Sequence, residues 1–156
     1  MTSDSRCHQH LNLLAGIGTA GQPVHEQVPA AQVAGGRYRL EATPALVDGC
    51  AAGDLVEIDH AGRVSVIERG GNLAVQSFSE HDAFDVDQVE TLREAWAVEG
   101  GLVEAPPHLR FVVVTVPARI GFPRIEAITN RWSETTGSGW SFGNVFDKEG
   151  TPLNWW

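Results

Sequence analysis

The spacing of apolar residues changes near residue 80, and this change constrains the fold more than any other feature of the chain. Before it, apolar and polar residues alternate in short segments that are separated by glycine-containing turns. Such segments are typical of strands in a small antiparallel barrel or curled sheet. After it, apolar residues recur every three or four positions, as in amphipathic helices. The sequence therefore predicts an α+β protein with a strand-rich N-terminal half and a mixed second half.

The second half opens with the signature of a helix. Asp85 is a favourable N-cap residue, and Gln88 follows three positions later, as in a capping box. Gly100 and Gly101 provide an end. The apolar stripe between these signals consists of Val86, Val89, Leu92 and Trp96.

A hairpin, a second helix and a last strand are predicted next. Residues 102–103 and 109–116 should pair, and the second of these segments is so apolar that we expect it to be central and covered. Pro123 suits the first residue of a helix. The inner face of that helix would carry Ile125, Ile128 and Trp132. With a strand at 73–78 and another at 140–146, the order is βαββαβ, the ferredoxin-like pattern.

At 156 residues the chain has the length of about one domain. We expect one compact unit with four parts. These are a flexible lead-in at 1–22, a small antiparallel β-barrel or curled sheet at 23–78, a ferredoxin-like half at 73–147 that shares strand 73–78, and an aromatic tail at 148–156.

Several segments, taken in order, resemble one bacterial family. They are Gly36-Arg37-Tyr38-Arg39-Leu40, Gly53-Asp54-Leu55-Val56, the hairpin of residues 64–75, and a helix that leads to Val113, Thr115, Val116 and Pro117. Over residues 24–147 this order is similar to that of the family catalogued as domain of unknown function 4265. The resemblance implies no established activity and no catalytic residues.

The charge balance bears on the choice of partner. The formal net charge is −9, with 20 acidic residues against 11 Lys and Arg. Nucleic-acid binding relies on cationic side chains, and anionic membranes also attract them, so we expect neither partner. A basic protein is favoured instead. With only two cysteines and no apparent signal peptide or membrane span, we expect a cytoplasmic protein. The oligomeric state stays open.

Two motifs suggest cofactor or metal chemistry but lack its context. Residues 16–21 match G-x-G-x-x-G, yet Pro23 and Pro29 follow where a dinucleotide site needs a helix. Cys7, His8 and His10 provide three potential ligands, whereas a structural zinc site normally has four. We therefore predict no cofactor and no metal.

The most concentrated signal is acidic. Six carboxylates lie within residues 80–94, and we take them as the candidate partner-binding residues: Glu80, Asp82, Asp85, Asp87, Glu90 and Glu94. An ordinary solvated helix face is the simpler interpretation. His81 could act as a general base, but no nucleophile motif accompanies it. We predict no catalytic residue and leave enzymatic activity open.

Three functional hypotheses remain. The first is a non-enzymatic, cytoplasmic protein-binding module, in its most concrete form an immunity-like inhibitor of a basic toxin. The second is a small-molecule-binding domain or unrecognised enzyme, with a pocket between the two halves where polar groups converge, namely Asn72, Gln76, His81 and Asn144. The third is a structural partner that docks through Trp155 and Trp156. We expect at least one of these two tryptophans to pack on the domain instead.

Overall fold

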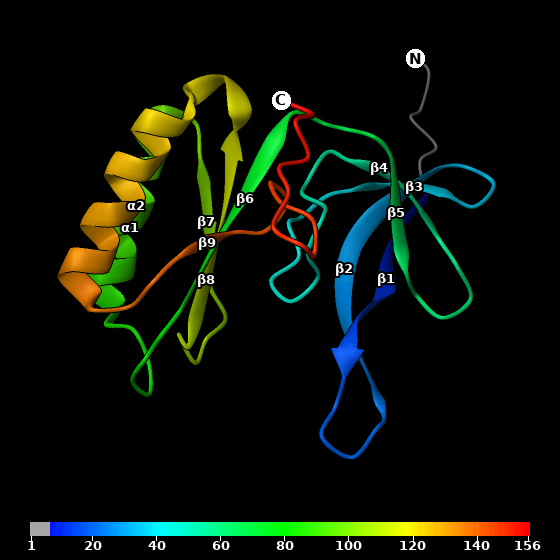
Figure 1. Ribbon diagram of the computed structural model, residues 1–156, viewed down its shortest axis with the longest axis horizontal. Coiled ribbons are helices and arrows are strands. Elements are labelled where there is room, and N and C mark those ends of the chain that lie inside the picture. The colour runs from blue at the N-terminus through cyan, green and yellow to red at the C-terminus, as the bar shows by residue number, and fades with distance from the viewer. Residues whose placement is uncertain (1–6) are drawn as a thin grey trace.

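The protein has a mixed α+β fold with two antiparallel sheets and two helices, as a computed structural model shows (Figure 1). The structure describes residues 7–156. The first sheet contains five strands in the order β1-β2-β3-β4-β5. These strands are β1 (Cys7–Ile17), β2 (Pro23–Ala34), β3 (Arg37–Leu40), β4 (Leu55–Ile58) and β5 (Val64–Glu68). Their inward side chains form one core, which includes Leu11, Leu13, Val28, Ala30, Leu40 and Val56.

Strand β1 corrects the expected boundaries of the first half. The lead-in predicted at 1–22 contains this strand, which pairs with β2 from Cys7 opposite Gln32 to Ile17 opposite Pro23. The glycine-rich run supplies the hairpin turn, where the Gly18 N–H donates to the Gln22 carbonyl over 2.7 Å. Residues 1–6 of the predicted lead-in lie outside the described residues.

The first sheet is curled but is not a closed barrel. Within residues 7–156, β1 pairs only with β2 and β5 pairs only with β4, so the sheet has two edges. The turn between β4 and β5 nevertheless reaches the far edge, because the Leu14 N–H of β1 donates to the Gly62 carbonyl over 2.8 Å. The predicted closed barrel is therefore not confirmed, and this half is an open antiparallel sheet.

The second half follows the predicted order of elements. It contains β6 (Asn72–Phe78), α1 (Val86–Glu99), β7 (Leu102–Glu104), β8 (Phe111–Pro117), the short 3-10 helix η1 (Ala118–Ile120), α2 (Phe122–Thr136) and β9 (Ser141–Phe142). Its four strands lie in the order β7-β8-β6-β9. Strand β6 pairs only with β8 and β9 among the described strands, so it is not shared between the halves.

Both helices cover one face of the second sheet, the face turned away from the first sheet (Figure 1). Their buried residues are Val89, Leu92 and Trp96 on α1 and Ile125, Thr129 and Trp132 on α2. This confirms the predicted stripes with two exceptions: Val86 lies in the first turn of α1 and is exposed, and Ile128 of α2 is only half-buried. Strand β8 is central and almost fully buried, as its apolar sequence predicts.

The predicted limits of the first helix are confirmed. The Asp85 side chain caps the helix by accepting a hydrogen bond from the Asp87 N–H, and Gly100 ends it with a left-handed φ of 84°. None of the helices in the described part of the chain is long and apolar enough to cross a membrane.

Backbone contacts join the two halves. The Gly49 N–H donates to the Gly143 carbonyl over 2.7 Å. Nearby, Gly70 packs on Gly53 so closely that a Cβ on Gly70 would lie 2.3 Å from the Gly53 carbonyl carbon. Only glycine fits there. The loop between β3 and β4 is thereby held against the start of β6.

Candidate functional site

The acidic residues predicted to bind a partner lie on the surface at and before α1. All six are exposed. In the described residues only Glu90 forms an ion pair, with Arg93 at 3.2 Å, and Asp85 is used as the helix cap. Asp87, Glu90 and Glu94 follow one another along α1 at helical spacing, and we call them the acidic stripe. Their charges are therefore largely free to act on a partner.

A groove runs beside this stripe, between α1 and α2. Its volume is about 580 Å³. The apolar residues that line it are Leu92, Ala95 and Val98 of α1 and Ala127, Ile128 and Trp132 of α2. The helices are antiparallel, because Arg124 at the start of α2 pairs with Glu99 at the end of α1 over 2.7 Å. Asp87 lies on one wall of the groove, and Arg131 lies on the other.

Val98 marks the groove as unusual for the surface of a monomer. Its side chain is 86% exposed. An isolated exposed valine needs no explanation, but this one continues an apolar strip formed by Ala95, Ala127 and Ile128. Contiguous apolar surface of this kind is common where another molecule docks.

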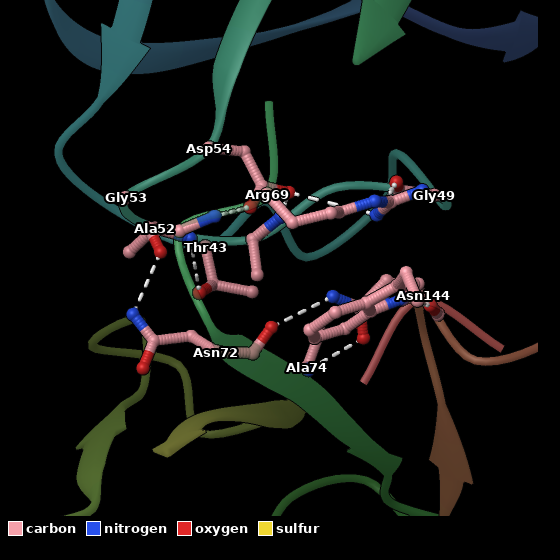
Figure 2. A network of polar contacts seen from close by, with 12 residues as sticks. Thr43, Gly49, Ala52, Gly53, Asp54, Arg69, Asn72, Ala74 and Asn144 are labelled. Carbon is pink, nitrogen blue, oxygen red and sulfur yellow. Dashed lines mark hydrogen bonds and ion pairs between the residues drawn. The ribbon is translucent and has the colours of Figure 1, made fainter. Parts of the chain in front are cut away.

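Three of the four residues predicted to line a pocket between the halves lie close together, namely Asn72, Gln76 and Asn144. Asn72 and Asn144 belong to a hydrogen-bonded junction instead of lining a pocket (Figure 2). Asn144 is fully buried; its Oδ1 accepts from the Ala74 N–H over 2.8 Å, and its Nδ2 donates to the Asn72 carbonyl over 2.9 Å. The Asn72 amide in turn donates to the Ala52 carbonyl over 2.7 Å. Gln76 is buried beside Gly143, and its Nε2 has no hydrogen-bond partner among the described residues. Of the three bonds above, the one from Asn72 to Ala52 crosses between the halves, whereas both bonds of Asn144 lie within the second half.

His81 is the exception among these four. It lies exposed in the loop before α1. It follows β6 by three residues, and its backbone N–H donates to the Ser79 hydroxyl over 3.2 Å. The structure therefore does not bring His81 into the junction.

A buried carboxylate organises the first-half side of this junction. Asp54 is fully buried, and its two oxygens accept from the N–H groups of Ala51 (3.0 Å) and Gly70 (2.8 Å). Burial raises the pKa of the Asp54 carboxyl, while these hydrogen bonds and the nearby Arg69 oppose the rise. The guanidinium of Arg69 stands 3.7 Å from Asp54 and donates to the Gly49 carbonyl over 2.8 Å.

Cys50 lies in the same region and is shielded from solvent. Burial, together with the charge of Asp54, raises the pKa of the Cys50 thiol to about 12. Cys50 is therefore present as an inert thiol at neutral pH. The second cysteine, Cys7, is exposed on β1.

The aromatic tail packs on the junction. A turn at residues 147–150 reverses the chain, and the Leu153 N–H donates to the Val145 carbonyl over 2.8 Å. The Trp155 indole donates to the Asn144 carbonyl over 2.8 Å and lies 5.2 Å from the Arg69 guanidinium. Trp156 contacts Phe122 edge to face and stays 43% exposed. The predicted packing of at least one tryptophan is thus present.

No clustered ligands for a metal occur in the part of the chain that the structure describes. Of the three potential ligands near the N-terminus, His8 instead contacts Glu41, its Nδ1 lying 2.9 Å from a carboxylate oxygen.

Sequence reasoning missed Arg69 and the role of Asp54. Arg69 touches Gly49, Asp54 and Trp155, which are distant from it in the sequence and leave no local pattern. A possible signal was Asp54 itself, a single acidic residue directly before the apolar pair Leu55 and Val56.

Comparisons with known proteins place the chain in a family. A family model described as "Domain of unknown function (DUF4265)" matches residues 26–140. Among solved structures, a hypothetical protein from Neisseria gonorrhoeae is similar, with a TM-score of 0.64 and 16% sequence identity over 90% of this chain and 96% of that chain. At that identity the likeness concerns the fold alone. A search of curated proteins finds no match. Because the family model covers well over half of the sequence, this chain belongs to the DUF4265 family.

Proposed function

We propose that this protein is a protein-binding module that docks a basic, amphipathic segment of its partner in the groove between α1 and α2. The observation that carries the proposal is the contiguous apolar lining of this groove beside the acidic stripe. Complete burial of a valine such as Val98 contributes about 1.5–3 kcal/mol to association before ordering costs are subtracted.

Charge complementarity decides the class of partner. Glu94 and Asp87 have no cationic partner in the described residues, and the whole chain carries a net charge of −9. A segment with Lys or Arg beside its apolar face would meet opposite charge along α1, which speeds encounter. On the opposite wall Arg124 is already paired with Glu99, while Arg131 forms no ion pair among the described residues. A carboxylate on the partner segment would add an ion pair with Arg131.

The more specific form of this proposal is an immunity-like inhibitor in the cytoplasm that neutralises a basic toxin. Small size and strong negative charge support it, because both suit a rapid inhibitor of a cationic enzyme. We also propose a ferredoxin-like classification for the second half. The strand order β7-β8-β6-β9 with two helices on one face supports that classification.

A peptide titration tests the docking site. The probe is an 18-residue helical peptide of leucine and lysine, with leucines on one face, and its counterpart replaces every lysine with glutamate. Amide chemical shifts in ¹⁵N spectra should change along α1 and α2 with the lysine peptide and stay unchanged with the glutamate peptide.

Matched variants separate specific docking from general attraction. The triple variant Asp87→Asn, Glu90→Gln, Glu94→Gln should weaken binding about 5- to 150-fold, since each exposed charge contributes about 0.3–1 kcal/mol. The control is Asp48→Asn, Glu104→Gln, Glu149→Gln, which changes the net charge equally at exposed positions away from the groove. Equal loss in both triples, or shifts outside the helices, would refute the proposed site.

A further inference from the structure

A second cavity lies where the two halves meet, apart from the helical groove. Its volume is about 460 Å³. The first half contributes Val66 and Arg69, and the second contributes Phe142, Phe146, Lys148 and Leu153. The walls thus combine an apolar and aromatic part with four charged residues, the cations Arg69 and Lys148 and the carboxylates Asp48 and Asp147. Small-molecule sites are commonly cavities of this size between parts of a fold, where apolar side chains and a few polar groups line the wall.

The guanidinium of Arg69 is fixed in position at this cavity. Its Nη1 donates to the Gly49 carbonyl over 2.8 Å and lies 3.7 Å from the Asp54 carboxylate. The Trp155 ring lies 5.2 Å away (Figure 2 shows Arg69 between Asp54 and Gly49). Yet the side chain stays 24% exposed, and among the described residues neither Nε nor Nη2 makes a hydrogen bond. Two donors of a preorganised guanidinium are therefore free.

We infer that this cavity binds a small organic monocarboxylate with an apolar body, and that Arg69 anchors the carboxylate. The planar edge of a guanidinium matches the two oxygens of a carboxylate, and an arginine that is already ordered loses little entropy on binding. The side chains of Phe142, Phe146 and Leu153 would cover the apolar body. Lys148 adds a second cation at the rim.

Carboxylates at and near the cavity limit the ligand to a single negative charge: Asp48 and Asp147 line it, and Asp54 lies 3.7 Å from Arg69. The two oxygens of Asp54 also accept hydrogen bonds from the backbone N–H groups of Ala51 and Gly70, so Asp54 does not occupy all the donors of Arg69. One oxygen of Asp147 accepts from the N–H groups of Glu149 and Thr151 within its own turn. Asp48 at the rim remains free and would repel polyanions such as phosphate esters.

The test is a titration of the intact protein with small probes, followed by ¹⁵N spectra. The probes are 3-phenylpropionate, 2-phenylethylamine with the same ring and opposite charge, acetate without an apolar body, and inorganic phosphate. We expect saturable shifts at Gly49, Val66 and Gly143 with 3-phenylpropionate, and at least tenfold weaker binding of the other three. Equal binding of the amine, or shifts elsewhere in the molecule, would overturn the inference.

Variants identify the anchor. Arg69→Lys should weaken 3-phenylpropionate binding at least tenfold, because lysine keeps the charge and loses the planar pair of donors. Since Arg69 also supports the junction, a second variant, Phe146→Ala, removes a 48% exposed wall of the cavity with little risk to folding. It should weaken binding severalfold, whereas Phe78→Ala, at a similarly exposed position outside the cavity, should not. Equal effects of the two alanine variants would contradict the site. Because the site is separate from the helical groove, neither result bears on the proposed protein docking.

Discussion

Asn144→Ala is the substitution whose effect on stability follows most directly from the junction. Just beyond β9, two hydrogen bonds continue the pairing with β6. The Gly143 N–H donates to the Ala74 carbonyl, and the Asn144 Oδ1 takes the place of a backbone carbonyl by accepting from the Ala74 N–H. Its Nδ2 satisfies the Asn72 carbonyl. Alanine leaves the buried Ala74 N–H without a partner, which costs about 1–3 kcal/mol, and it also removes the partly buried hydrogen bond to Asn72, about 0.5–1.5 kcal/mol.

The expected loss is therefore about 2–4 kcal/mol in the free energy of unfolding, a large part of the 5–15 kcal/mol typical of a domain. Urea denaturation followed by circular dichroism measures it, and the slope m should not change. The matched control is Asn130→Ala, which removes the exposed hydrogen bond from the Trp140 indole. This control should cost less than about 1 kcal/mol.

Asn144→Asp adds a test by pH. A protonated aspartic acid has the same shape and can donate to the Asn72 carbonyl, whereas the carboxylate cannot and is buried. Burial raises the pKa of such a group, so the variant's stability should be highest at low pH and fall relative to the parent as pH rises through that pKa. A loss below about 0.5 kcal/mol for Asn144→Ala, or an Asn144→Asp variant indifferent to pH, would refute the role assigned to this side chain.

Three further predictions concern single features of the fold. With a pKa of about 12, Cys50 should resist iodoacetamide at pH 8 in the folded protein while the exposed Cys7 is alkylated, as mass spectrometry of the peptides would show. Because folding raises the pKa of the Cys50 thiol, the free energy of unfolding should also fall as the pH rises from about 9 toward 12. Gly143→Ala should destabilise by about 1–3 kcal/mol in urea, since its Cβ would lie 2.9 Å from a buried glutamine amide, whereas Gly139→Ala meets open space and should be neutral. Deletion of residues 151–156 should lower stability by about 2–4 kcal/mol through lost tryptophan packing, and an unchanged melt would show that the tail does not support the fold.

The sequence predicted the second half well because its structure is encoded locally. The stripe of Val89, Leu92 and Trp96 specifies which face of α1 is buried, and the apolar run of β8 specifies a central strand. These patterns need no knowledge of distant contacts. Strand β1 was missed for the opposite reason. Only Leu11 and Leu13 on it are buried, and its partner β2 lies beyond a glycine-rich turn that by itself looks like a linker.

The candidate sites differ in the same way. The acidic stripe follows from helical spacing, so the sequence could locate it; the groove beside it depends on how α1 and α2 pack, and no spacing reveals that. Most of the polar residues predicted to line a pocket lie close together, but in a junction. The reason is that the buried Asn144 side chain uses its hydrogen-bonding groups on backbone groups of β6 that would otherwise be unpaired.

Arg69 connects the packing of the two halves with the monocarboxylate proposed for the junction cavity. Arg69 lines the junction cavity, and its guanidinium is held in place by Gly49, Asp54 and Trp155. Gly49 and Asp54 belong to the loop between β3 and β4, and Trp155 belongs to the tail, so the cavity is complete only when both halves and the tail are assembled. A ligand that pairs with Arg69 should therefore stabilise the contact between the halves as well as occupy the cavity, since binding to the folded state alone adds RT ln(1 + [L]/Kd) to the free energy of unfolding. The helical groove, by contrast, lies within the second half, so a partner bound there can be recognised without any change at the junction.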